Sequence, residues 1–156
     1  MFRLLALFIL TCLAATPLWA FERAQVDRLI ATGKCPRCDL SGANLAGLYL
    51  NQADLTGANL SDTDLSRAKL SKAKLAGASL KGANLKETFL GGADLRQADL
   101  RHADLAKTEF YRAQLQEANL TGASVYHTGF NLADLSDAYW IDGRRCLKKS
   151  VGVCDL

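Results

Sequence analysis

The sequence predicts an all-β solenoid, and three regularities of residues 40–140 support this fold class. One apolar residue occupies every fifth position without a change of register, and it is leucine at each such position from Leu40 to Leu105. Alanine usually stands two residues before it. Some replacements recur at intervals of twenty, since Thr88 and Thr108 both stand where alanine is usual. These patterns indicate a chain that coils with a fixed period.

The five-residue period fits neither an α-helix nor an extended strand. On a helix of about 100° per residue, five steps rotate a side chain by roughly 140°, so the leucines would spread over every face. In a strand, an odd period would place successive leucines on opposite faces. The chain must therefore turn once per repeat so that each leucine returns to one interior. The interval of twenty then predicts four repeats in each coil.

The repeats, residues 35–140, resemble the A(D/N)LXX motif of pentapeptide-repeat proteins. The resemblance is carried by the runs Ser41-Gly-Ala-Asn-Leu45, Thr56-Gly-Ala-Asn-Leu60, Lys81-Gly-Ala-Asn-Leu85 and Arg96-Gln-Ala-Asp-Leu100. It implies a right-handed quadrilateral parallel β-helix in which leucine and alanine point inward and the other three residues of each repeat point outward. With about 4.8 Å between stacked strands, the repeats predict a rod of roughly 25 Å.

Residues 1–20 are predicted to be a cleavable signal peptide. Arg3 precedes an almost wholly apolar run over residues 4–13, and small residues follow up to Ala20, after which we expect cleavage. Retention as an anchor and lipid attachment through Cys12 are the alternatives. Loss of Arg3 would leave 18 basic and 16 acidic residues, a formal charge of +2 in place of +3. The predicted localisation is periplasmic or extracellular, with no stable membrane span after cleavage.

Two segments flank the repeats and are expected to cover the ends of the rod. Residues 21–34 predict a short helix that ends at Gly33, and we expect it to cap the open strand edges of the first coil. A helix that binds a partner is the alternative. Residues 141–156 form an irregular tail. Tyr139, Trp140 and Ile141 would plug that end or meet a second copy, because some relatives dimerise through C-terminal coils, so a homodimer is the alternative there.

Four cysteines follow the predicted signal peptide, and an even number in an exported chain favours disulfides. They are Cys35, Cys38, Cys146 and Cys154. The first two lie at the first coil and the last two beyond the final repeat, so we predict the local pairs and a disulfide-closed tail. A nine-residue loop meets disulfide geometry easily. Cys35 and Cys38 occupy inward positions, where free thiols are the alternative.

The Cys35-Pro-Arg-Cys38 sequence also has the spacing found in thiol oxidoreductases and zinc knuckles. A redox cysteine is activated at a helix N-terminus, whereas this pair follows the predicted helix. Zinc takes four ligands, and the two later cysteines are not placed to complete the set. A thiol-redox or metal-binding protein that uses this pair is therefore the alternative function.

No catalytic residue, metal or cofactor is predicted. His102 and His127 stand at outward positions of different sides, away from any cluster with metal-ligand spacing. The outward aspartates belong to the motif, where asparagine replaces them freely, so hydrogen bonding explains them better than catalysis. A leucine-filled interior leaves no cavity for a substrate. We therefore predict a protein that is not an enzyme.

Nucleic acid is not a predicted partner. The pentapeptide-repeat proteins best understood in function mimic DNA with a strongly acidic rod, and the slightly positive charge of this chain lacks the field that such mimicry needs. A charge of +2 is also too weak, in an exported protein, to favour direct binding to DNA or RNA.

One side of the predicted coil is basic and aromatic. The possible binding surface comprises Tyr49, Lys69, Lys72, Phe89, Tyr111 and Arg112. Phe89 stands where the motif favours aspartate or asparagine, and an exposed aromatic ring is typical of contact surfaces. The alternative is that an exposed strand tolerates aromatics while lysines maintain solubility. We predict an exported interaction or structural module of the bacterial envelope, whose partner is an unknown protein or an anionic envelope polymer.

Overall fold

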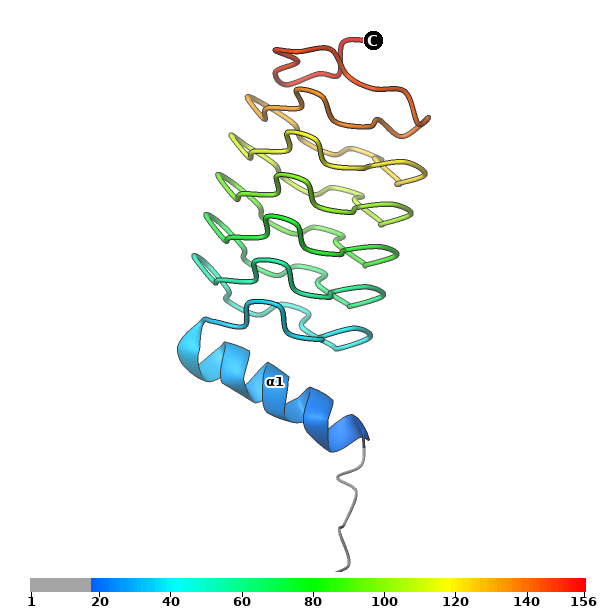
Figure 1. The fold of residues 1–156 in the computed structure, drawn as a ribbon. Coiled ribbons are helices and arrows are strands. Elements are labelled where there is room, and N and C mark those ends of the chain that lie inside the picture. The colour runs from blue at the N-terminus through cyan, green and yellow to red at the C-terminus, as the bar shows by residue number, and fades with distance from the viewer. Residues whose placement is uncertain (1–17) are drawn as a thin grey trace, which may run out of the picture.

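The structure is a computed structural model that describes residues 18–156, and it shows one helix followed by a stack of similar coils (Figure 1). Helix α1 spans Leu18–Thr32. The coils follow along one axis and the C-terminal tail lies at the far end of the stack (Figure 1). Their β-structure consists of isolated bridges between coils, with no longer strand among the described residues. The predicted signal peptide, residues 1–20, lies outside the described residues up to residue 17 and overlaps α1 beyond it.

Each parallel bridge joins a residue to the residue twenty positions later, from Lys34 with Asp54 to Asn119 with Tyr139. Twenty residues hold four repeats, so the coil has four sides, as the sequence predicts. We number the sides by their outward bridge residues. Side 1 has residues 34, 54, 74, 94, 114 and 134, side 2 has 39, 59, 79, 99, 119 and 139, side 3 has 44, 64, 84, 104 and 124, and side 4 has 49, 69, 89, 109 and 129.

The leucine and alanine of each repeat form one continuous core. Leu55, Leu75 and Leu95 are fully buried, and so are most alanines of the motif. Burying one leucine stabilises a fold by roughly 1.5–3 kcal/mol, so the regular column supplies most of the apolar stabilisation. At the C-terminal end, Phe110 stacks on Phe130 with ring centroids 5.1 Å apart, and Trp140 meets Phe130 edge to face. The core therefore ends in aromatic rings.

Every backbone N–H of a regular repeat has an acceptor, as the repeat 54–58 shows. The N–H of Asp54 donates to the preceding coil, and the N–H groups of Leu55 and Gly57 donate to the next coil. The N–H of Ala58 closes the corner by donating to the carbonyl of Leu55 at 3.0 Å. The remaining N–H, at Thr56, donates to the Asp54 carboxylate at 3.2 Å. We call this last bond the corner cap, because the outward aspartate or asparagine supplies it.

The threonines that recur in the core are satisfied in the same way. Thr88 and Thr108 are fully buried, and their hydroxyls donate to the carbonyls of Leu65 and Leu85 at 2.7 and 2.6 Å. A buried hydroxyl without an acceptor is costly, so these bonds explain why the column tolerates a polar residue in place of alanine.

Helix α1 covers the first coil. Leu29 is fully buried against the core, and the Gln25 side chain accepts a hydrogen bond from the Asp39 N–H at 2.8 Å. In later coils the carbonyl of the preceding coil accepts this bond, so Gln25 replaces a coil that does not exist. Helix α1 begins three residues before the predicted segment, 21–34, because Leu18, Trp19 and Ala20 also adopt the helical conformation. It ends before Gly33, whose left-handed backbone stops it.

The tail covers two of the four strand edges at the other end. Val151 pairs antiparallel with Asp134 on side 1, and Arg145 pairs antiparallel with Tyr139 on side 2. Within residues 18–156, no bridge covers the last edges of sides 3 and 4. The C-terminal end is therefore only half closed.

The second residue of each corner adopts a left-handed backbone, and Gly77 provides a clean test of its cost. Its φ is +65°, and a Cβ added there would meet no atom within 4 Å. We expect Gly77→Ala to lower the free energy of unfolding by about 1 kcal/mol, because only the backbone conformation opposes the methyl group. Urea denaturation measures the change. Gly91→Ala is the matched control: Gly91 lies outside the left-handed region and its added Cβ would make an ordinary contact, so its stability should not fall.

The outward aspartates make the stability of the fold depend on pH. The Arg96 guanidinium holds the pKa of the Asp94 carboxyl below its ordinary value by hydrogen bonding to it, and Arg101 does the same for the pKa of Asp99. The folded state then binds fewer protons than the unfolded state, where the pKa is about 3.9. This stabilisation is present above about pH 4 and is lost as the pH falls through the lowered values. We therefore expect the melting temperature to decrease below about pH 4.

A neutral variant isolates this contribution. Asp94→Asn retains an oxygen for the corner cap, as Asn59 does for Ser61, but it cannot titrate, so its melting temperature should fall less steeply with acid than that of the wild type. Asp62→Asn is the control, because the Asp62 carboxylate accepts no hydrogen bond among the described residues. An identical acid slope for Asp94→Asn and wild type would contradict the assignment.

Candidate functional site

Side 4 departs from the other three sides at every outward position. Sides 1, 2 and 3 carry aspartate or asparagine in several coils, whereas side 4 carries Tyr49, Lys69, Phe89, Glu109 and Gly129. Bridges stack these five residues in register. The structure therefore brings the sequence-predicted column of Tyr49, Lys69 and Phe89 together on one surface.

Cations lie against the exposed aromatic rings of this surface. The Lys69 ammonium lies 3.8 Å from the centroid of the Phe89 ring, and the Arg112 guanidinium lies 5.1 Å from that of Tyr111. The rings remain accessible: Tyr49 is 82% exposed, Phe89 42% and Tyr111 47%. Such pairs contribute roughly 0.5–1 kcal/mol each at exposed sites and hold the side chains in place.

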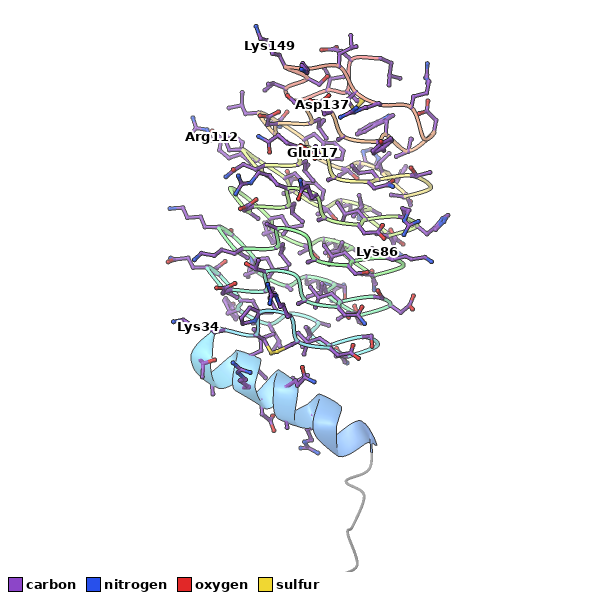
Figure 2. The ribbon with its side chains drawn as sticks, in the orientation of Figure 1. Lys34, Lys86, Arg112, Glu117, Asp137 and Lys149 are labelled. Carbon is purple, nitrogen blue, oxygen red and sulfur yellow. A yellow bond between two sulfur atoms is a disulfide. The ribbon has the colours of Figure 1, made fainter. Side chains whose placement is uncertain are left out.

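The charge of the chain is concentrated on this part of the rod. We define the side 4 face as side 4 with the corners that flank it, residues 46–52, 66–72, 86–92, 106–112 and 126–132. It holds six Lys and Arg residues against two Glu residues, a formal charge of +4. The whole chain carries +3, which leaves −1 for all other residues. Figure 2 shows Lys86 and Arg112, from the two flanking corners, projecting from opposite edges of the rod.

Ion pairs engage some cations of the rod and leave others free, and among the described residues Lys74 and Lys81 on other sides also lack a carboxylate within 4 Å. On other corners Arg96, Arg101, Arg144 and Arg145 each pair with an aspartate. On the side 4 face, Arg67 and Lys107 share Glu87, and Lys86 pairs with Asp104, which raises the pKa of Lys86. Among the described residues, no carboxylate lies within 4 Å of the charged groups of Lys69, Lys72 and Arg112. These three cations remain available to a partner.

A shallow depression lies beside Phe89. Its volume is about 400 Å³, and it is lined by Arg67, Lys69, Glu87, Phe89, Lys107 and Glu109. The two glutamates were not among the residues predicted for the surface, because a search for basic and aromatic residues passes over carboxylates. Their place in the stack, one at the outward position and one at the corner, is what identifies them. The depression thus offers both cations and hydrogen-bond acceptors around an apolar ring.

A second depression, of about 300 Å³, lies at the corner between sides 1 and 2. It is lined by Ala76, Arg96, Gln97, Gln116 and Glu117. Its arginine is paired with Asp94, and its Gln97 amide donates to Glu117, so its polar groups are largely engaged within the chain. It has no exposed aromatic ring. The depression on side 4 is therefore the better candidate for a binding site.

The cysteines form two short-range disulfides. Cys35 is bonded to Cys38, and Cys146 is bonded to Cys154. Cys35 is fully buried and Cys38 is 7% exposed, and the Cys35 sulfur lies 3.6 Å from the Gln25 carbonyl of α1. Thiol–disulfide exchange requires a thiolate to reach one of the two sulfur atoms, and helix α1, which covers this disulfide, obstructs that approach. This burial favours a structural role over redox chemistry.

No group of three or more His, Cys, Asp or Glu side chains within residues 18–156 is arranged to hold a metal ion. Over the same residues, no helix has the length and apolar character that crossing a bilayer requires.

Comparisons with known proteins agree with this architecture. The family model for pentapeptide repeats matches residues 37–71, 63–101 and 98–137, with eight copies. The chain is similar to the pentapeptide-repeat protein Rfr23 of the cyanobacterium Cyanothece 51142, with 30% identity over 68% of this chain and 89% of that one and a TM-score of 0.50. It is also similar to a pentapeptide-repeat protein of the Arabidopsis thaliana thylakoid lumen, with 26% identity over 80% and 86% of the two chains and a TM-score of 0.52.

Among curated proteins, none matches the chain significantly. The family match covers about two-thirds of the sequence, and the solved relatives share the four-sided coil built here from bridges at an interval of twenty. The chain belongs to the pentapeptide-repeat family and folds as a right-handed quadrilateral β-helix.

Proposed function

We propose that this protein is an exported, non-enzymatic interaction module of the bacterial envelope that contacts its partner through the side 4 face. The observation that carries the proposal is the concentration of unpaired cations and exposed aromatic rings on one of four otherwise similar sides. Contact surfaces are enriched in aromatic residues and arginine. A regular rod would stay soluble without these aromatic side chains, so solubility does not explain their presence.

Export is supported by three independent features. The N-terminal sequence has the basic, apolar and small-residue order of a signal peptide. The two disulfides fit an oxidising compartment. A relative of similar fold resides in the thylakoid lumen. Together they favour the periplasm or the cell exterior as the site of action.

A role in binding is favoured over catalysis by the packing of the rod. Its interior is filled by leucine, alanine and phenylalanine side chains, so a ligand meets only the outer surface. Enzymes hold substrates in deeper concave sites with converging polar groups. The shallow depression beside Phe89 suits recognition of an extended partner.

We expect substitution of the aromatic residues on the side 4 face to weaken binding of the partner. A variant with Tyr49→Ser, Phe89→Ser and Tyr111→Ser should recover markedly less partner than wild type when crosslinked in native envelope and purified by affinity. Tyr139→Ser, at the same outward position on side 2, is the matched control and should recover the partner normally. Recovery of the same partner by all three proteins would refute the role of this face.

The C-terminal end supports a second proposal, which concerns assembly: a homodimer through the half-closed end. The last coil and the tail carry exposed apolar side chains, among them Leu132, Leu147 and Val153, and the edges of sides 3 and 4 at this end are uncovered within residues 18–156. Open strand edges and apolar side chains both favour association with a second copy.

Sedimentation measures this assembly directly. We expect the wild type to sediment as a dimer and the double variant Leu132→Asp with Val153→Asp to sediment as a monomer, because two buried carboxylates would oppose the interface. Ile30→Asp, at an exposed residue of α1, is the control for the opposite end and should remain dimeric. A monomeric wild type at high concentration would exclude the dimer.

A further inference from the structure

We infer that the side 4 face binds an acidic polysaccharide, whose carboxylates replace the corner caps missing at Gly91 and Tyr111. The inference rests on the proposed function and narrows it to one ligand class. Its basis is a backbone feature of this face that charge and exposure alone do not show.

Two corner N–H groups after side 4, those of Gly91 and Tyr111, lack the acceptor that the motif normally supplies, whereas the Ser71 N–H donates to the Asn51 side chain at 3.0 Å. Where the other sides carry an outward aspartate or asparagine, it accepts a bond from the N–H two residues later, as Asp94 does from Arg96. Where they carry another residue, as at Lys74, no acceptor is found among the described residues for that N–H either, so side 4 differs in the cations and aromatic rings beside its open corners. On side 4, the residues two positions before Gly91 and Tyr111 are Phe89 and Glu109. Among the described residues, no acceptor is found for the N–H groups of Gly91 and Tyr111.

The direction of these N–H groups follows from the regular corners. There the donor points outward, to the side chain that projects from the preceding outward position. In side 4 the same geometry aims the Gly91 N–H along the Phe89 ring, toward solvent. Backbone N–H groups at such bends are natural sites for an anion. A ligand carboxylate placed there would make the bond that an aspartate makes elsewhere.

Cations stand beside this position, and nothing obstructs it. Lys72 lies in the preceding coil and Arg112 in the next, and neither is paired with a carboxylate within the described residues. Gly91 and Gly92 leave the corner between them without side chains, and Cβ atoms added there would meet only Tyr111 and Lys72, at 3.7 and 3.5 Å. This corner at Gly91 and Gly92, which we call the notch, thus leaves room for an anionic group, with Lys72 and Arg112 in the coils on either side.

The neighbouring surface suits a sugar ring. Phe89 exposes its ring between the notch and the depression of about 400 Å³, and the depression offers the carboxylates of Glu87 and Glu109 as acceptors for hydroxyl groups. An aromatic face packs against the C–H groups of a pyranose, while charged side chains fix its polar substituents. An acidic sugar ring bound there would pack against the Phe89 ring and would have the carboxylates of Glu87 and Glu109 and the cations of neighbouring coils around it.

The order of charges along the rod favours a polymer that alternates acidic and neutral sugars. The coil 66–72 carries three cations and no acid, the coil 86–92 presents Phe89 and two glycines with one cation, Lys86, balanced by Glu87, and the coil 106–112 carries Lys107 and Arg112 against Glu109. The coils are spaced by about 4.8 Å, and a pyranose advances a polysaccharide by about one such rise. A chain laid along the axis would meet a cationic coil, a coil without net charge that presents Phe89, and a cationic coil in turn.

An acidic peptide fits this face less well. Its usual route of binding to β-structure is pairing with a free strand edge. On side 4 the backbone is engaged between coils, since the Phe89 N–H donates to Ala68 at 3.0 Å and the Glu109 carbonyl accepts from Leu90 at 2.8 Å. Glu87 and Glu109 would also repel a run of adjacent carboxylates.

Titration calorimetry on the mature, disulfide-bonded protein tests the inference with four probes. They are a hyaluronan octasaccharide, which alternates glucuronate with a neutral sugar, a polygalacturonate oligomer, dextran and polyglutamate. We expect the hyaluronan octasaccharide to bind, dextran to give no signal, and polyglutamate to bind at least about tenfold more weakly. Polyglutamate that binds as tightly as the saccharides, or no binding of either acidic saccharide, would overturn the inference.

Single substitutions at Phe89 separate two contributions to binding, the free N–H of Gly91 and the aromatic ring. Phe89→Asn restores the motif and supplies an internal acceptor for the Gly91 N–H, so it should weaken hyaluronan binding about tenfold or more. Phe89→Leu leaves that N–H free and should weaken binding less. Lys74→Asn makes the corresponding change on side 1 and should bind as wild type. Equal loss in Phe89→Asn and Phe89→Leu would refute the role of the N–H group.

The outcome is distinguishable from failure of the proposed function. If no saccharide binds but the envelope crosslinking still depends on Tyr49, Phe89 and Tyr111, the face binds a protein and only the ligand class is wrong. If both measurements fail, the proposed function fails with it. Melting curves of each variant confirm that the coil remains folded in every comparison.

Discussion

The backbone hydrogen bond between coils is the constraint on which the rest of this structure depends. A chain that turns every five residues exposes its N–H groups in many directions, and a compact rod forms only if each finds an acceptor. The twenty-residue register meets this need: three N–H groups of a repeat reach neighbouring coils, one closes the corner and one takes the cap from an aspartate or asparagine. The motif is the sequence expression of that arrangement.

The regularity of this bonding explains which features the sequence predicts well. Leucine every fifth position and the twenty-residue interval follow directly from the register, so the four sides and the buried column were predictable from residues 40–140 alone. The column of Tyr49, Lys69 and Phe89 was predictable for the same reason. Once the register is known, any outward residue is assigned to a side by counting.

The ends and the paired charges were harder to predict because they do not repeat. Gln25 substitutes for a missing coil through one side-chain oxygen, and the tail turns back to pair antiparallel with sides 1 and 2. No periodic signal marks either contact. Counting charged residues likewise gives the net charge of a face but not which side chains form ion pairs. That Arg96 and Arg101 are neutralised while Lys72 and Arg112 are not appears only when side chains are placed.

Under the proposed function, the side 4 face is a specific surface that the repeat protein has gained without a change of fold. The core requires only leucine and alanine, so the outward position can lose its aspartate wherever another acceptor, water or ligand, takes the corner N–H. Such a loss leaves a donor at a fixed place unless another side chain accepts from it, as Asn51 does from the Ser71 N–H. On sides 1, 2 and 3 the losses are scattered, whereas on side 4 they form a complete column beside cations and rings. Loss of the motif along a whole side is therefore what the proposed contact surface predicts, because tolerance of substitution would scatter the losses over all four sides.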